Sequence, residues 1–147
     1  MDSAWRAVGS HRIRVIDDRV ELRQCGVLTL AHVLEYFRCV ERVSEQYHYS
    51  LSLFDQYEAG GLEPSARTYM GQRSRALSSP TALAVVGASL PMRTLARLII
   101  RAINMIRNPP LHIGFFNAEL DALAYLSLNR KEFRAQLHLP HDQAPPA

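Results

Sequence analysis

Residues 81–128 read TALAVVGASLPMRTLARLIIRAINMIRNPPLHIGFFNAELDALAYLSL, and this stretch decides the fold. Two short apolar runs, 81–88 and 111–116, have the length and composition of buried strands. Residues 91–106 and 117–128 carry apolar side chains at the spacing of amphipathic helices, and Asn117 is placed to open the second one. Strands and helices that alternate in this way predict a parallel sheet with crossover helices.

The residues before this stretch predict further elements of the same kind. They are strands at 12–16, 19–23 and 48–55, and helices at 29–47 and 63–77. Asp17-Asp18 suits the turn of a β-hairpin, Thr29 can cap a helix, and Gly60-Gly61 is predicted to break the chain. The predicted order is ββαβαβαβα, which is an α/β fold with a mixed, mostly parallel sheet and an N-terminal hairpin.

Length and composition bound the class of protein. A chain of 147 residues is long enough for one domain with a real core. We expect this domain to span residues 11–137 after a flexible lead, residues 1–10. Residues 138–147 include Pro140, Pro145 and Pro146 and are predicted to form a disordered tail.

Charge and cysteine content argue against several classes of protein. The net charge of +3 is too small to indicate a nucleic-acid binder, which concentrates cations on one face. The longest apolar stretch, 95–106, is interrupted by Arg97 and Arg101 and falls short of the roughly 20 residues of a membrane span, so no stable membrane insertion is expected. Cys25 and Cys39 have no C-x-x-C spacing and no signal sequence precedes them, which predicts a cytoplasmic location.

One pattern runs through the second half of the chain. A strand leads through a small-residue turn into an arginine-containing apolar helix, and a strand ending in aromatic residues precedes a last helix with an aromatic residue. Here these parts are 81–86, Gly87-Ala88-Ser89, 92–106, Phe115-Phe116-Asn117 and Ala124-Tyr125-Leu126. Over residues 11–130 the chain resembles the STAS superfamily, the fold of bacterial anti-sigma-factor antagonists, to which the CRAL-TRIO lipid-binding domain is distantly related.

One departure from the family's pattern concerns phosphorylation. Anti-sigma-factor antagonists usually carry an Asp-Ser pair, with a phosphorylated serine, where the third strand meets the second helix. This chain has no such pair. Ser65 lies near the equivalent helix start, where backbone N–H groups favour a phosphate, so it is the phosphorylation candidate. The alternative is an ordinary polar residue in a first turn. We expect Gly60, Gly61 and Ser65 to belong to the recognition surface.

A stripe of arginines follows one side of the helix predicted at 92–106. Arg93, Arg97 and Arg101 are spaced by four residues, and no acid within the helix neutralises them. Such a stripe can receive a phosphate, an acidic partner face or an anionic membrane surface. The alternative is a solvated face, or pairing with acids of the next helix, Glu119 and Asp121.

The apolar arc of the same helix is wider than packing on a sheet requires. Its members are Met92, Leu95, Ile99, Ile100 and Ile103. Part of the arc is expected to face a partner subunit or a ligand, and ordinary core packing is the alternative.

No motif for catalysis or for a cofactor is present. Gly60-Gly61 is followed by neither a dinucleotide-binding fingerprint nor a Walker lysine, and residues 87–91 lack the closing glycine of a nucleophile elbow. Ser89 is expected to cap the helix that follows it, or to bind an anion there. No enzymatic activity and no cofactor are predicted.

No metal site is predicted either. His32, Glu35 and Cys39 share one side of a helix, but a fourth ligand is not evident, so we expect a surface trio. His112 lies in a predicted strand and is expected to be a hydrogen-bonded edge residue rather than a catalytic base.

The resemblance implies a non-catalytic STAS-like module that acts by protein–protein contact in bacterial regulation or signalling. Its partner would be another protein or a second copy of the chain. The alternative is that the domain binds a lipid or other amphiphile in the manner of the CRAL-TRIO domains, with the apolar arc as a slot and the arginines as an anion clamp.

Overall fold

The computed structural model describes residues 4–139, in which three strands are followed by alternating helices and strands. The strands are β1 (Arg6–Val8), β2 (His11–Ile16), β3 (Arg19–Leu28), β4 (Ser50–Leu62), β5 (Thr81–Val86) and β6 (His112–Phe116). The helices are α1 (Leu30–Tyr47), α2 (Pro64–Ala76), α3 (Leu90–Asn104) and α4 (Glu119–Gln136). The predicted α/β class and element order are confirmed, and β1 is an additional strand within the stretch expected to be a flexible lead.

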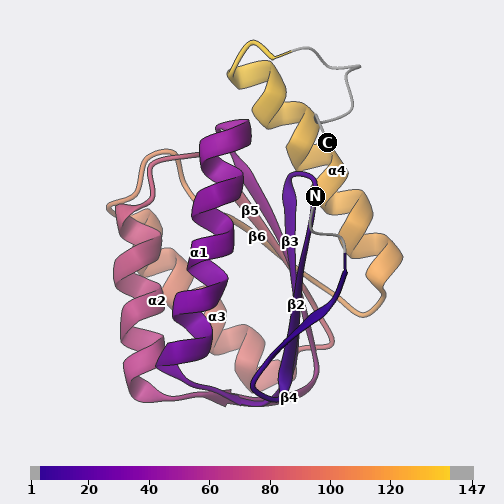
Figure 1. Ribbon diagram of the computed structural model, residues 1–147. Helices are drawn as coiled ribbons and strands as arrows, with labels where there is room; N and C mark the ends of the chain where they lie inside the picture. The colour runs from indigo at the N-terminus through magenta and orange to yellow at the C-terminus, as the bar shows by residue number, and fades with distance from the viewer. Residues whose placement is uncertain (1–3, 140–147) are drawn as a thin grey trace.

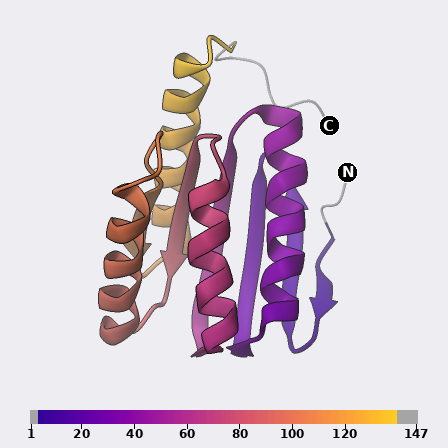
Figure 2. The same cartoon turned by 90° about the vertical axis from the view of Figure 1, so that its left-hand side faces the viewer.

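All six strands form one sheet in the order of the chain, β1-β2-β3-β4-β5-β6. The pairs β1–β2 and β2–β3 are antiparallel, and the remaining pairs are parallel, so the predicted hairpin and mostly parallel sheet are confirmed. Because each parallel strand lies next to its successor, right-handed crossovers bring the connecting helices to one face. Figures 1 and 2 show α1, α2 and α3 on that face and α4 alone on the other.

The face under α1 is a dense aromatic and aliphatic core. Tyr36, Phe37 and Val40 of α1 are buried on the sheet, and the Tyr36 ring meets Phe54 edge-on with centroids 4.9 Å apart. The Tyr36 hydroxyl is hydrogen-bonded to Ser52 Oγ at 2.7 Å, which satisfies both buried groups.

Beneath α4, strands β5 and β6 contribute small residues to the sheet. Ala82 and Ala84 are completely buried there, and a Cβ atom added at neighbouring Gly114 would lie 3.2 Å from the Tyr125 ring of α4. Small residues let the helix approach the sheet closely, and Leu126 and Phe133 of α4 fill the space that remains.

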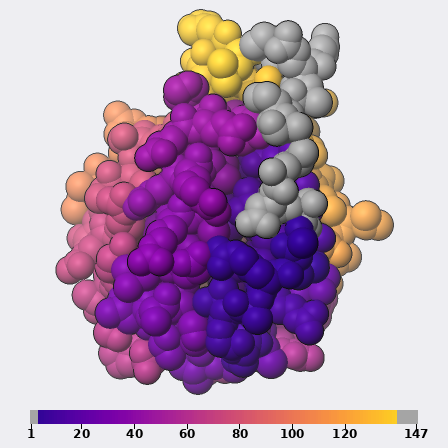
Figure 3. Space-filling view, in the orientation of Figure 1, coloured from indigo at the N-terminus to yellow at the C-terminus, as the bar shows by residue number. Residues whose placement is uncertain are grey.

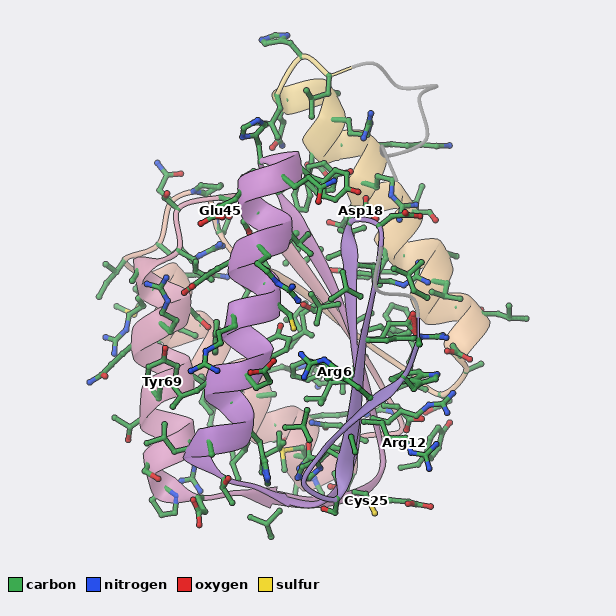
Figure 4. All side chains as sticks on the ribbon, viewed as in Figure 1. Arg6, Arg12, Asp18, Cys25, Glu45 and Tyr69 are labelled. Carbon is green, nitrogen blue, oxygen red and sulfur yellow. The ribbon has the colours of Figure 1, made fainter. Side chains whose placement is uncertain are left out.

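A buried carboxylate anchors α4 to the hairpin. Asp18, in the β2–β3 turn, has no exposed surface and accepts hydrogen bonds from Tyr49 Oη at 2.6 Å and from Arg130 Nε and Nη2 at 2.6 and 2.7 Å. Figure 4 shows Asp18 at the end of the hairpin beside α4, and Cys25 at the opposite end of β3. The ion pair with Arg130 therefore joins residues 112 positions apart in the sequence.

The N-terminal strand lies against α1. The Arg6 guanidinium forms an ion pair with Glu35 and donates to Cys39 Sγ at 3.4 Å. Figure 3 shows the indigo residues of the N-terminus against the purple residues of α1. Cys39 is buried, so the surface position expected for it was wrong.

Two predicted boundaries were also wrong. β4 continues through Gly60-Gly61 to Leu62, because Gly60 lies against the backbone of Gly26 in β3; a Cβ at Gly60 would be 2.9 Å from the Gly26 carbonyl carbon. Asn117 does not open the last helix, whose N-cap is Ala118. Most of the predicted tail, 140–147, lies outside the described residues. Within residues 4–139, no helix has the length and apolar character needed to cross a bilayer.

Candidate functional site

α3 contributes little to the closed core. Ser89 caps it, because its Oγ accepts a hydrogen bond from the Met92 backbone N–H at 3.3 Å, and Pro91 lies in its first turn. Ile103 is its one buried residue, whereas α1 has seven. The apolar residues of α3 recur at helical spacing, but most of them are not fully buried against the sheet.

An apolar cavity of about 110 Å³ lies between α3 and the sheet, with α1 and α2 beside it. From α3 it is lined by Met92, Leu95, Ala96, Ile99, Ile100 and Ile103. From the sheet it is lined by Phe54, Leu83, Val85, Ile113 and Phe115. All five residues of the predicted apolar arc thus line one cavity.

The polar residues around the cavity are few and include no acid. They are Gln56, Arg67, Ser74, Thr81 and Arg107. Arg67 is an exposed residue of α2, whereas Arg107, in the segment after α3, is buried. The lining is therefore apolar with two cationic residues, and only one of these is removed from water.

Buried Arg107 is held by uncharged oxygens. Its Nε donates to the carbonyl of Leu77 at 3.0 Å, Nη1 to the carbonyl of Pro109 at 3.0 Å, and Nη2 to the carbonyl of Ser79 at 2.6 Å and to Thr81 Oγ1 at 3.0 Å. Burial lowers the pKa of Arg107 from its usual value, because the charged form loses its hydration. Arg107 could not be predicted as a site residue, since nothing in the local sequence distinguishes an arginine in a loop after a helix.

The predicted arginine stripe lies on the outer flank of α3. Arg93 Nε donates to the Ala88 carbonyl at 3.1 Å, and its Nη2 donates to Asn117 Oδ1 at 2.8 Å. The Arg97 guanidinium lies 5.0 Å from the centre of the Phe115 ring. Arg101 is exposed.

Of the two alternatives for this stripe, the structure has the solvated face for Arg97 and Arg101 and not the pairing with acids of the next helix. Glu119 and Asp121 belong to α4, which covers the opposite face of the sheet (Figure 2). Among residues 4–139, no ion pair neutralises any of the three arginines. The outer flank of α3 therefore keeps its positive charge.

The other candidates lie at the carboxyl edge of the parallel strands. Gly60 and Gly61 lie at the irregular end of β4, between Ala59, which pairs with Gly26, and Leu62, which pairs with Leu28, rather than in an open loop. Ser65 is exposed in the first turn of α2. None of the three lines the cavity, although Leu62 and Met70 from the same segment do.

The histidine candidates have structural partners. His32 Nδ1 accepts a hydrogen bond from the Thr29 backbone N–H and so completes the start of α1. His112 Nδ1 is hydrogen-bonded to Asn129 Oδ1 at 2.6 Å, as expected of a satisfied strand residue. In the described part of the chain, no group of three His, Cys, Asp or Glu residues is arranged to hold a metal ion.

Comparisons with known proteins support the fold. No protein-family model and no curated protein matches this chain. An uncharacterized protein of the DUF3478 family from Shewanella loihica PV-4, which has a SpoIIAA-like fold, matches with a TM-score of 0.56 and 19% identity over 86% of this chain and 95% of its own. The unphosphorylated anti-sigma factor antagonist SpoIIAA matches with a TM-score of 0.49 and 16% identity over 84% and 97% of the two chains. The architecture shared with the DUF3478 protein is the one that the sequence pattern predicted.

Proposed function

We propose that this STAS-like domain acts by binding rather than by catalysis, and that it holds an apolar or amphiphilic small molecule between α3 and the sheet. The observation that carries the proposal is the unfilled space of about 110 Å³ with its apolar lining. Ligand pockets of proteins are typically apolar with a small number of polar groups. An engineered cavity of about 150 Å³ in another protein binds benzene.

The energetics favour occupation of this space. An unfilled apolar pocket forgoes van der Waals contacts along its lining and leaves that apolar surface accessible to water. An apolar ligand restores the missing van der Waals contacts and transfers its own surface out of water. The apolar residues on the inner side of α3 therefore favour the binding of an apolar ligand.

Ala96 and Ala102 give a matched test. Both lie on α3, but Ala96 lines the cavity and Ala102 is exposed. We expect the wild type to bind the neutral fluorophore N-phenyl-1-naphthylamine with increased emission. Ala96→Phe should abolish the increase because the new ring occupies the cavity, and Ala102→Phe should preserve it. A wild type that leaves the emission unchanged, or an Ala96→Phe variant that behaves like it, would contradict the proposal.

A second candidate function is contact with an acidic protein partner in bacterial regulation. It is supported by the outer flank of α3, where Arg97 and Arg101 have no carboxylate partner among the described residues. Between them Leu98 is 59% exposed. Cations around an exposed apolar residue suit a partner with the opposite charge. A cytoplasmic setting and phosphorylation of Ser65 are further parts of this hypothesis.

This candidate predicts a charge-dependent partner. We expect one protein to be captured from the native lysate by the wild type and by the control Lys131→Glu, and lost with Arg97→Glu/Arg101→Glu. Lys131 is exposed on α4, so the control changes the same kind of charge on the other face. The same set of proteins on all three baits would reject the candidate.

A further inference from the structure

Arg107 places a positive charge at one end of the cavity. Leu77 and Thr81, to which Arg107 donates hydrogen bonds, line the cavity beside it. Of the other lining residues, Met92 lies in the first turn of α3, and Leu62 ends β4. Arg107 is 5% exposed, so water screens its charge poorly.

No acid compensates this charge. The four hydrogen bonds of Arg107 all go to carbonyl or hydroxyl oxygens, and no ion pair involves it among residues 4–139. A buried cation without an anion is costly, because carbonyl dipoles replace only part of its hydration. A guanidinium has five N–H groups, so one on Nη1 has no acceptor among the described residues. The site therefore favours a ligand that brings a negative charge.

The cavity also sets the shape of such a ligand. Its lining follows α3 from Met92 to Ile103, which is about 16 Å of helix at 1.5 Å per residue. The side chains along this path are apolar, so a ligand with a single extended apolar chain matches it. The positive charge lies at one end of the cavity and the apolar lining along the rest. This arrangement matches a molecule with a charged group at one end of an apolar chain.

We infer that the ligand is a single-chain amphiphilic carboxylate, with its carboxylate against Arg107 and its chain along α3 toward Met92. This inference rests on the proposed binding function and specifies the chemical class of the ligand. A carboxylate at Arg107 forms a charge-assisted hydrogen bond in a site of low dielectric, where such bonds are strongest. The neutral alcohol of the same length makes the same apolar contacts without this interaction.

The test compares decanoate, decanol and decyltrimethylammonium as competitors of N-phenyl-1-naphthylamine at pH 7.5. We expect the wild type to bind decanoate at least tenfold more tightly than decanol, and the ammonium compound most weakly. Arg107→Gln should remove the preference for decanoate while decanol still binds. The control Arg101→Gln, on the outer flank of α3, should keep it. A wild type that binds decanol as tightly as decanoate would overturn the inference but leave the proposed function intact, whereas failure of both to bind would reject the two together.

Two further variants cover the other outcomes. Arg107 holds three backbone carbonyls, so Arg107→Gln will be checked for folding by circular dichroism. If it does not fold, Arg107→Lys, which keeps the charge, must retain the preference for decanoate. Arg67→Gln tests the second cation of the lining. Loss of the preference in Arg67→Gln, with retention in Arg107→Gln, would overturn the assignment of Arg107.

Discussion

The Tyr57 ring lies directly over Gly87, so that a Cβ atom added at Gly87 would be 2.6 Å from Tyr57 Cγ. The Tyr57 hydroxyl donates a hydrogen bond to the backbone carbonyl of Asn117. A side chain of β4, just beyond the part of that strand that pairs with β5, thus crosses the end of β5 and reaches the residue that follows β6. Gly87 permits this crossing because it lacks a side chain and because its φ of +77° suits glycine.

Gly87→Ala is expected to lower the free energy of unfolding by about 1–3 kcal/mol, because it strains the backbone and displaces Tyr57. Urea denaturation measures the change. Gly71→Ala is the control, since a Cβ at Gly71 meets no atom within 4 Å and the residue lies inside α2. Alanine there should stabilise the protein by about 0.5–1 kcal/mol. If both substitutions changed the free energy of unfolding equally, the position of the Tyr57 ring would not require a glycine at position 87.

Asp18→Asn is expected to lower the free energy of unfolding by about 3 kcal/mol, because it leaves the buried side of Arg130 without a counterion. Asp17→Asn is the matched control. Asp17 is partly exposed and has a φ of 52°, a conformation that asparagine accepts readily, so its effect should stay within about 0.5 kcal/mol. Similar losses from both variants in urea denaturation would contradict the role of Asp18 as the anchor of α4.

His11 is expected to make the fold sensitive to acid. Its Nδ1 accepts a hydrogen bond from the Cys25 backbone N–H, so the other nitrogen, Nε2, carries the proton that faces the Val27 carbonyl. Burial lowers the pKa of His11 from 6.5, and the neighbouring His32 lowers it further, although the bond to Val27 opposes the shift. Because the unfolded chain then takes up the proton first, the stability from neutral His11 is complete above about pH 6.5. It declines as the pH falls toward the folded-state pKa.

The measurement is the free energy of unfolding at pH 7.5 and pH 5.5. The loss between the two pH values should be smaller in His11→Asn than in the wild type. His48→Asn is the control, since His48 is exposed and its left-handed φ of 67° suits asparagine. An unchanged pH dependence in His11→Asn would assign the acid sensitivity to other groups.

Leu126 and Leu128 provide a matched pair on α4. Leu126 is 1% exposed and Leu128 is 67% exposed. Leu126→Ala should cost about 2–5 kcal/mol through the cavity that it leaves under the helix, and Leu128→Ala less than about 0.5 kcal/mol. A thermal denaturation series ranks the two. A large effect of Leu128→Ala would instead indicate that this exposed residue is covered in solution by another molecule.

Local periodicity predicted most of the fold because each element carries its own signal. The strand of β5 and the helix of α1 could be located from the spacing of their apolar residues alone. The extension of β4 through Gly60 could not be predicted, because a Gly-Gly pair usually marks a turn or a loop. The backbone of Gly26 in β3 lies so close to Gly60 that a side chain would not fit there. Gly26 is 34 residues away in the sequence, so the local sequence does not reveal this contact.

The candidate site was predicted only in part for the same reason. The wide apolar arc of α3 marked Met92 and Ile100, and both line the cavity. Arg107 carried no signal, since its partners Leu77 and Ser79 come from the other side of β5 in the sequence. Asn117 was expected to cap α4, but its side chain accepts a hydrogen bond from Arg93, and that contact depends on how β6 lies beside α3.

The small side chains beneath α4 restrict which substitutions β5 tolerates on that face of the sheet. Ala82 and Ala84 alternate along β5 with Leu83 and Val85, which face the cavity. Enlarging Ala84 would lift α4 and cost about 1–3 kcal/mol, as overpacking does. Enlarging Leu83 would instead use vacant space. Residues that face the cavity should therefore vary more in size among related sequences than those beneath α4. Such changes would alter the ligand that fits the cavity and leave the fold intact.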